Sequence, residues 1–223
     1  MNKQTVAVLD FGSQYTQLIA RRIREQNVYS EILPHTITAE ELNKKNVPAI
    51  ILSGGPSSVY DKNAPQVDPS ILSMGIPVLG ICYGLQLMIT QNGGNVTHKG
   101  QGEYGFAKMH TVNESPLLKN LENESQVWMS HGDSVTELPP GFSALAFTDN
   151  SPMAVVGDGG GRLGIQFHPE VAHTPQGKAL IQNFLYRVCS AQQLWTPGNF
   201  VAETVENIRT QVGDGQVICA LSG

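Results

Sequence analysis

The sequence has few cysteines and no pattern that would join them. Its 223 residues include three, Cys82, Cys189 and Cys219, which are far apart and form no Cys-x-x-Cys pair. An odd number of widely spaced cysteines argues against a disulfide framework and against a zinc site. We therefore expect no metal centre, and this cysteine usage fits a reducing compartment such as the cytoplasm.

Positive charge and long apolar runs are also scarce. The net charge of −5 at pH 7 offers no basic surface to nucleic acid and no attraction to anionic membranes. No apolar stretch approaches the length of a transmembrane helix, and the polar residues before Thr5 do not resemble a signal peptide. Neither nucleic-acid nor membrane partners are expected.

Sequences that bind phosphates are missing too. Neither a Gly-x-Gly-x-x-Gly after a strand nor a Walker A sequence occurs, so this chain is not predicted to bind a nucleotide. Asp10-Phe11-Gly12 matches the metal-binding triplet of kinases, but the glycine-rich and catalytic loops of kinases do not accompany it. We therefore reject a kinase-like site.

The first half of the chain alternates between strand-like and helix-like segments. A hydrophobic content of 40% and a charged content of 15% are typical of a globular chain with a substantial core. The alternating segments lie at 5–9, 15–26, 29–33, 38–42, 49–52, 69–74 and 77–81. This order predicts an α/β fold with an open, mostly parallel sheet that helices cover on both faces.

The second half predicts an antiparallel extension of that sheet. Short strand-like pieces separated by turn residues lie at 104–112, 126–129, 143–148, 154–156 and 163–167. The glycine-rich run at 157–161 predicts a hairpin turn, and residues 174–188 predict an amphipathic helix.

The last part of the chain has a different character. Thr196 and Pro197 can begin a helix, whose apolar positions follow at spacings of three and four residues: Val201, Val205, Ile208 and Val212. Residues 216–221 then show the pattern of a buried strand. We interpret 1–190 as one domain, and 191–223 as a linker helix and the first strand of a following, truncated domain.

A cysteine between two glycines marks the most distinctive stretch. Cys82 follows an apolar strand pattern and precedes a helix pattern, with Gly80 and Gly84 two positions away on either side. This is the cysteine counterpart of the nucleophile elbow, a strained strand-to-helix turn where bulky neighbours would clash. Such a turn presents the sulfur at a helix N-terminus, where the dipole favours the thiolate. A buried core cysteine is the alternative interpretation.

His168 and Glu170 form a second candidate pair. Pro169 favours an extended backbone at His168, and residues two apart in an extended segment face the same way. The carboxylate could then fix the tautomer of an imidazole that polarises a nucleophile. A surface ion pair is the commoner explanation for two such residues. A triad with Cys82 would have to be assembled by the fold.

Two glycines follow the predicted third strand, in Ser53-Gly54-Gly55-Pro56. At the carboxyl end of a parallel strand, glycines let a backbone N–H approach a ligand closely. The N–H groups of Gly55 and Tyr83 could therefore form an oxyanion hole. A plain Gly-Pro turn is the alternative.

Together these stretches resemble the class I glutamine amidotransferases, in the order 53–56, 80–86 and 166–170. Four further motifs are similar to those of the glutaminase domains of GMP synthetases: 10–16, 128–133, 173–174 and 194–197. The resemblance covers the whole chain, and it implies that the predicted sheet has a flavodoxin-like arrangement.

The resemblance implies a role for each candidate residue. Cys82 would attack the side-chain amide of glutamine to form a γ-glutamyl thioester, His168 would transfer the protons, and Glu170 would orient His168. The backbone amides of Gly55 and Tyr83 would bind the oxyanion. The amino-acid end of glutamine would be held by Gln86, Ser130 and Asp133.

The resemblance also implies partners. In that family an ATP pyrophosphatase domain of the same polypeptide uses the ammonia to convert XMP to GMP. ATP and Mg²⁺ are then expected for that domain, no cofactor for the glutaminase, and a homodimer for the full-length enzyme. Ser222-Gly223 resembles the start of the phosphate loop of that domain.

Two alternatives to this interpretation are a glutaminase that feeds carbamoyl phosphate, anthranilate or CTP synthesis, and a non-catalytic binding module. The 194–197 motif and the end of the chain argue against the first alternative. The presence of Cys82, His168 and Glu170 argues against the second.

Overall fold

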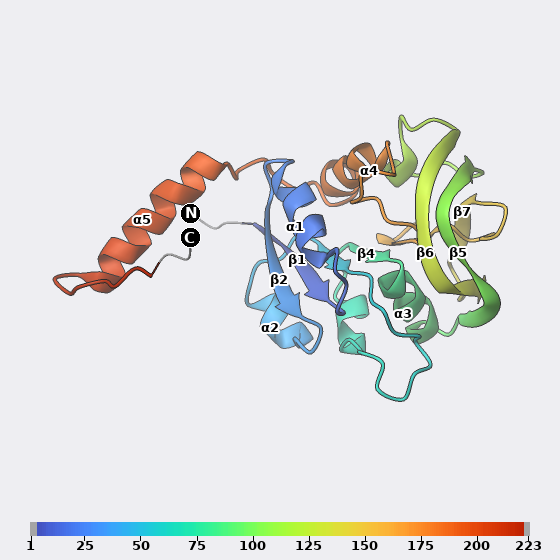
Figure 1. Ribbon diagram of the computed structural model, residues 1–223, viewed down its shortest axis with the longest axis horizontal. Coiled ribbons are helices and arrows are strands. Elements are labelled where there is room, and N and C mark those ends of the chain that lie inside the picture. Colours follow the sequence, from blue (N-terminus) through green and yellow to red (C-terminus); the bar gives the residue numbers. More distant parts are fainter. Residues whose placement is uncertain (1–3, 221–223) are drawn as a thin grey trace.

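A single mixed sheet forms the centre of the protein (Figure 1). The computed structural model describes residues 4–220, apart from the side chains of residues 99–101. In this part of the chain nine strands form one sheet in the order β2-β1-β3-β4-β9-β8-β7-β5-β6. The first five strands in that order are parallel, and the remaining four continue the sheet in antiparallel pairs. The predicted parallel sheet with an antiparallel extension is therefore confirmed.

The strands agree closely with the predicted segments, except that two of them are much longer. Their bounds are β1 (Thr5–Asp10), β2 (Tyr29–Pro34), β3 (Ile50–Leu52), β4 (Val78–Ile81), β5 (Asn95–Thr111), β6 (Glu124–Glu137), β7 (Ser143–Phe147), β8 (Val155–Gly157) and β9 (Arg162–Ile165). β5 and β6 pair along most of their length and form the curved ribbon at one end of the molecule (Figure 1). The predicted hairpin turn at 157–161 joins β8 to its antiparallel neighbour β9.

Helices cover both faces of the parallel strands. Their bounds are α1 (Thr16–Arg24), α2 (Ala39–Asn43), the 3₁₀ helix η1 (Pro69–Ser73), α3 (Tyr83–Gln91), the 3₁₀ helix η2 (Pro116–Leu118), α4 (Gly177–Asn183), the π-helix η3 (Phe184–Val188) that continues α4, and α5 (Pro197–Val212). In the described part of the chain, none of them is long and apolar enough to cross a membrane.

Side-chain alternation in β1 shows why both faces are covered. Val6 and Val8 belong to the core that contains residues of α1 and α4, whereas Ala7 and Leu9 belong to the core that contains residues of α2 and α3. Successive side chains of a strand point to opposite faces, and here both sets are apolar. An apolar strand of this kind is stable only between two layers of helices.

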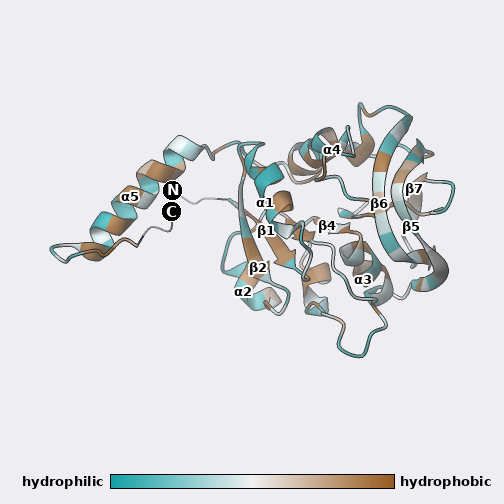
Figure 2. Ribbon diagram, viewed as in Figure 1, coloured by the Kyte–Doolittle hydropathy of each residue, from teal (hydrophilic) through white to brown (hydrophobic). Residues whose placement is uncertain are grey.

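The C-terminal helix α5 lies outside this body. Figure 1 shows it projecting beyond the β2 edge of the sheet, and none of its residues is buried. It begins as predicted, because Thr196 Oγ1 accepts a hydrogen bond from the Asn199 amide and Pro197 occupies the first turn. Its apolar positions Val201, Val205 and Ile208 are exposed and Val212 is half-buried, and hydrophobic and hydrophilic segments alternate along the helix in Figure 2.

The strand predicted at 216–221 is wrong for the residues that the structure describes. Residues 216–220 are not part of a strand, and Leu221 lies outside the described residues. A strand is stabilised by hydrogen bonds and side-chain pairs with a neighbouring strand. The nine-stranded sheet pairs none of its strands with this segment.

Candidate functional site

Cys82 lies at a strained turn between β4 and α3. Its φ of 51° and ψ of −106° place it in a region that side chains with a Cβ rarely adopt. The Cys82 amide donates a hydrogen bond to the Ile165 carbonyl at 2.7 Å, and the Gly84 amide donates to the Ser53 carbonyl at 3.1 Å. The ends of β9 and β3 therefore hold the turn from both sides. The predicted strained strand-to-helix turn is confirmed.

Close backbone contacts require the two glycines beside Cys82. A Cβ added to Gly80 would lie 2.6 Å from backbone atoms of Gly84 and Leu85. A Cβ added to Gly84 would lie 2.3 Å from the carbonyl oxygen of Leu52. Because the opposing atoms belong to backbone, they cannot rotate away. The glycine pattern that identifies the turn in the sequence therefore has a packing cause.

His168 and Glu170 lie just beyond β9, which is the neighbour of β4. The parallel register pairs Ile81 with Ile165, so the carboxyl ends of the two strands meet. His168 Nδ1 is 2.7 Å from Glu170 Oε1, and both side chains are buried. Arg22 Nε of α1 donates a hydrogen bond to the Glu170 carbonyl at 2.9 Å. The pair is therefore part of the interior and is not a surface ion pair.

The imidazole of His168 lines the same cavity as the Cys82 sulfur, and the two side chains interact electrostatically. Because Nδ1 faces Glu170, Nε2 is the ring nitrogen left for the sulfur. Burial acts to lower the pKa of His168, but the hydrogen bonds and charges of Cys82 and Glu170 outweigh burial and raise this pKa to about 10. The imidazolium form is therefore favoured at neutral pH, where it can hold a thiolate.

Replacing Glu170 with glutamine tests the cause of this raised pKa. The carboxylate favours the imidazolium, so Glu170→Gln should lower the pKa of His168 by about 1–3 pH units. A pKa raised from 6.5 to about 10 stabilises the folded protein fully below pH 6.5, and this contribution is lost as the pH rises through about 10. We therefore expect the destabilisation by Glu170→Gln to be largest at low pH and to fade toward pH 10.

An NMR titration of the His168 ring in both proteins measures the pKa directly. Glu124→Gln is a matched control, because Glu124 pairs with Lys108 and His110 on the surface, away from His168. An unchanged His168 midpoint in Glu170→Gln would contradict the proposed cause.

The reactive groups open into a cavity of about 600 Å³. Its wall includes six of the predicted residues: Gly55, Cys82, Gln86, Ser130, Asp133 and His168. The other two predicted residues, Glu170 and Tyr83, do not line the cavity. Glu170 is the partner of His168. The Tyr83 hydroxyl donates a hydrogen bond to the Pro65 carbonyl at 2.6 Å. A role of Tyr83 at the cavity would therefore come from its backbone N–H. Among the described side chains, no group of three or more His, Cys, Asp or Glu residues could hold a metal ion.

Gly54 and Gly55 bring the end of β3 against the reactive side chains. A Cβ added to Gly54 would lie 3.2 Å from His168 Cε1 and 3.7 Å from Cys82 Cβ. One added to Gly55 would lie 2.7 Å from the Phe11 carbonyl oxygen. Glycine at position 55 therefore lets this backbone pass close to the loop after β1, and a side chain at position 54 would crowd the His168 ring.

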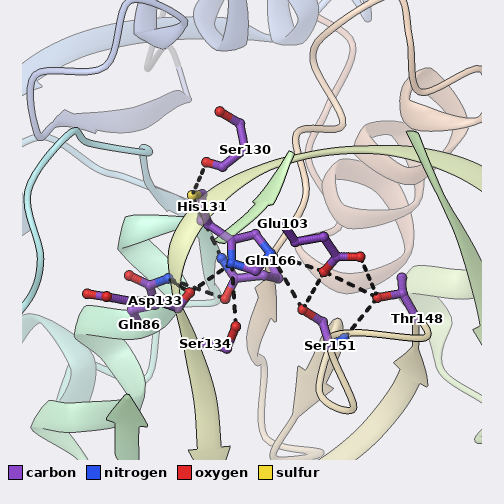
Figure 3. A network of polar contacts seen from close by, with 10 residues as sticks. Gln86, Glu103, Ser130, His131, Asp133, Ser134, Thr148, Ser151 and Gln166 are labelled. Atoms are coloured by element: carbon purple, nitrogen blue, oxygen red, sulfur yellow. Dashed lines mark hydrogen bonds and ion pairs between the residues drawn. The ribbon is translucent and has the colours of Figure 1, made fainter. Parts of the chain in front are cut away.

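A buried polar network extends from the part of the cavity wall formed by Ser130, His131 and Asp133, and Figure 3 shows its side chains. His131 Nδ1 is 2.8 Å from the Asp133 carbonyl oxygen, and His131 Nε2 is 3.4 Å from Glu103 Oε2. Burial acts to raise the pKa of Glu103, but hydrogen bonds with His131 and Ser151 outweigh burial and lower it. Sequence reasoning assigns no role to His131 and misses Glu103, because the network joins residues of β5 and β6 with a distant loop.

Three further cavity residues, Tyr15, His98 and Tyr104, are also missed by sequence reasoning. The Tyr15 ring is 5.2 Å from the His168 ring, and His98 Nδ1 is 2.9 Å from Asp133 Oδ1. The position of Tyr15 shortly after β1 could have identified it as a site residue, because sites in parallel sheets form where the carboxyl ends of neighbouring strands meet. His98 lies on the first part of β5, which the strand pattern does not reveal, whereas Tyr104 lies at the start of the predicted strand at 104–112 but belongs to no motif that indicates a site.

Comparisons with known proteins agree with this arrangement. Residues 7–188 match the family described as glutamine amidotransferase class-I. Curated relatives named GMP synthase [glutamine-hydrolyzing] include one from Trichormus variabilis, 53% identical, and one from Thermosynechococcus vestitus, 54% identical. Both alignments cover 100% of this chain but 42% of the relative, so the chain spans less than half the length of these proteins.

Solved structures show the same fold. A candidate GMP synthase subunit from Thermoplasma acidophilum matches with a TM-score of 0.74 and 25% identity, over 92% of this chain and 98% of that chain. A glutamine amidotransferase from Thermotoga maritima matches with a TM-score of 0.69 and 19% identity, over 84% of this chain and 99% of that chain. These neighbours agree with the flavodoxin-like arrangement expected of the sheet.

Proposed function

Because the chain belongs to the class I glutamine amidotransferases, we propose that it hydrolyses glutamine to glutamate and ammonia. The observation that carries this proposal is that Cys82, at its strained turn, and His168, paired with the buried Glu170, line one cavity. A thiolate, an imidazole and a carboxylate in this order can carry out acyl transfer from an amide.

In the proposed reaction the Cys82 thiolate attacks the side-chain carbonyl carbon of glutamine. The carbonyl oxygen becomes an oxyanion, which the backbone N–H groups of Gly55 and Tyr83 stabilise. The His168 imidazolium gives its proton to the leaving nitrogen, the C–N bond breaks, and ammonia departs. A γ-glutamyl thioester then remains on Cys82.

Hydrolysis of the thioester returns the site to its starting state. The neutral His168 takes a proton from water, and the resulting hydroxide attacks the thioester carbon. The C–S bond breaks and releases glutamate and the Cys82 thiolate. Throughout, Glu170 fixes the ring orientation and stabilises the imidazolium through its 2.7 Å contact with Nδ1.

Gln86, Ser130 and Asp133 are proposed to hold the amino-acid end of glutamine. All three line the cavity. Among the described atoms, Asp133 Oδ2 is buried and has no hydrogen-bond partner, although Oδ1 contacts His98. A buried carboxylate oxygen without a partner is suited to accept hydrogen bonds from the α-ammonium group of an amino acid.

We also propose that the ammonia serves the ATP-dependent amination of XMP to GMP. This rests on the name GMP synthase [glutamine-hydrolyzing] of relatives that are more than twice as long as this chain. Residues 1–190 would be the glutaminase domain, and 191–223 a linker helix and the start of an ATP pyrophosphatase domain that uses ATP and Mg²⁺. The exposed apolar positions of α5 support such a junction. The full-length enzyme would be a cytoplasmic homodimer.

A diazoketone analogue of glutamine tests the hydrolytic site. We expect one covalent adduct, at Cys82, which excess glutamine prevents, together with release of glutamate from glutamine. Cys189→Ala should still be labelled, because Cys189 lies outside the cavity. A folded protein that forms no adduct and releases no glutamate would instead be a binding module.

Addition of the synthetase part with XMP and ATP should accelerate glutamate release, and no acceleration would argue against the GMP assignment.

A further inference from the structure

Gln166 is a buried side chain that lies against the nucleophile and has no part in the mechanism above. It directly follows β9 and is 1% exposed. Its Nε2 is 3.8 Å from the Cys82 sulfur, within the range of a hydrogen bond to sulfur. Figure 3 shows Gln166 in the centre of the polar network, beside His131. A glutamine amide in this position can act on the sulfur directly.

A chain of hydrogen bonds fixes which end of the Gln166 amide faces the sulfur. The Asp133 carbonyl can only accept a hydrogen bond, and Gln86 Nε2 donates to it at 2.8 Å. The same Gln86 nitrogen donates to Gln166 Oε1 at 3.3 Å. If the Gln166 amide were flipped, two NH₂ groups would face each other. The backbone carbonyl of β6 therefore determines that Gln166 presents its N–H donors to Cys82.

We propose that Gln166 donates a hydrogen bond to the Cys82 sulfur and stabilises the thiolate that attacks the substrate, with Gln86 holding the Gln166 amide in the required orientation. This proposal adds a residue to the hydrolytic site proposed above, and the effect of Gln166 on catalysis rests on that proposed function. It assigns Gln166 a different task from His168, which transfers protons.

The contacts of the sulfur explain why this hydrogen bond favours the charged form. The sulfur is also 3.7 Å from the Ser130 carbonyl oxygen, which can accept a hydrogen bond from a thiol but repels a thiolate. An amide N–H offers a donor only, and a donor interacts more strongly with an anion than with a neutral thiol. Gln166 therefore opposes the effect of the Ser130 carbonyl and makes ionisation of Cys82 easier.

The pH dependence of Cys82 alkylation tests this role without glutamine. Iodoacetamide reacts with the thiolate, so the alkylation rate follows the ionised fraction of the thiol. In Gln166→Met, which keeps the side-chain length and removes the donor, the midpoint of the rate profile should rise by about one pH unit. In Gln166→Glu it should rise further, because a carboxylate adds a like charge next to the sulfur.

Mass spectrometry of the Cys82 peptide separates this reaction from that of the exposed Cys219, which serves as an internal standard. Gln126→Met is the matched control, because Gln126 is exposed and its amide donates to the His173 carbonyl outside the cavity. Thermal unfolding shows which variants are folded, and Gln166→Glu remains informative if Gln166→Met does not fold. A midpoint equal to that of the wild type in a folded Gln166 variant would overturn the proposal.

The rate of glutamine hydrolysis separates this proposal from the proposed function. Gln166→Met should hydrolyse glutamine about tenfold more slowly at neutral pH, and the deficit should shrink as the pH rises, because hydroxide restores the thiolate. A residue that only fills space would give a deficit independent of pH, and this result would also overturn the proposal. If the wild type hydrolyses no glutamine while the alkylation midpoint still shifts, the proposed function fails and the effect of Gln166 on the thiolate stands.

Discussion

Replacing Cys82 with alanine is expected to slow glutamine hydrolysis by a factor of about 10⁴ or more while leaving the fold intact. Alanine removes the sulfur, and with it the contacts to Ser130, Gln166 and His168. Alanine and cysteine both carry a Cβ, so the strain of the φ of 51° is nearly the same in both proteins. The loss should therefore be chemical and not structural.

Release of glutamate and thermal unfolding, measured side by side, test this expectation. Cys189→Ala is the control, because Cys189 is partly buried in the core beyond η3 and does not line the cavity. In a longer chain that carries the synthetase part, Cys82→Ala should still permit synthesis from free ammonia. A folded Cys82→Ala protein with the wild-type rate would remove Cys82 from the mechanism.

Replacing Gly84 with alanine is expected to destabilise the protein by about 3 kcal/mol or more. The added Cβ would lie 2.3 Å from the Leu52 carbonyl oxygen and 2.6 Å from Leu52 Cβ. Relief of this overlap requires α3 to move away from β3, which disturbs the turn that holds Cys82. We therefore expect hydrolysis and stability to fall together.

Denaturant unfolding measures the stability change. Gly198→Ala is the matched control, because no atom lies within 4 Å of a Cβ at Gly198 and the residue lies on the exposed helix α5. The control should unfold with the wild-type midpoint. An unfolding midpoint of Gly84→Ala equal to that of the wild type would contradict the packing argument.

Much of the fold follows from local patterns in the sequence. The apolar runs of β1, β3 and β4 are buried on both sides, and a capping box of Thr38 and Glu41 begins α2 at the predicted segment 38–42. These features can be predicted because short-range sterics and hydrogen bonding produce them. The strand pattern at 216–221 shows the limit of such reasoning, since a strand also needs a partner in space.

The site has the same division between local and distant causes. The turn at Cys82 follows from Gly80 and Gly84, and the 2.7 Å contact of His168 with Glu170 follows from their spacing across Pro169. The orientation of Gln166 and the Glu103–His131 contact do not follow from spacing. They depend on carbonyl and carboxylate groups that other strands supply.

Local patterns along the chain account for a strained cysteine, a histidine beside a carboxylate, and the strands that end at each of them. That these groups meet follows from the pairing of strands that are far apart in the sequence. β9 pairs in parallel with β4, although the long ribbon of β5 and β6 and the strands β7 and β8 separate them along the chain. β3 pairs with one edge of β4, so β9 can pair only with the opposite edge. Which edge remains free is a property of the assembled sheet.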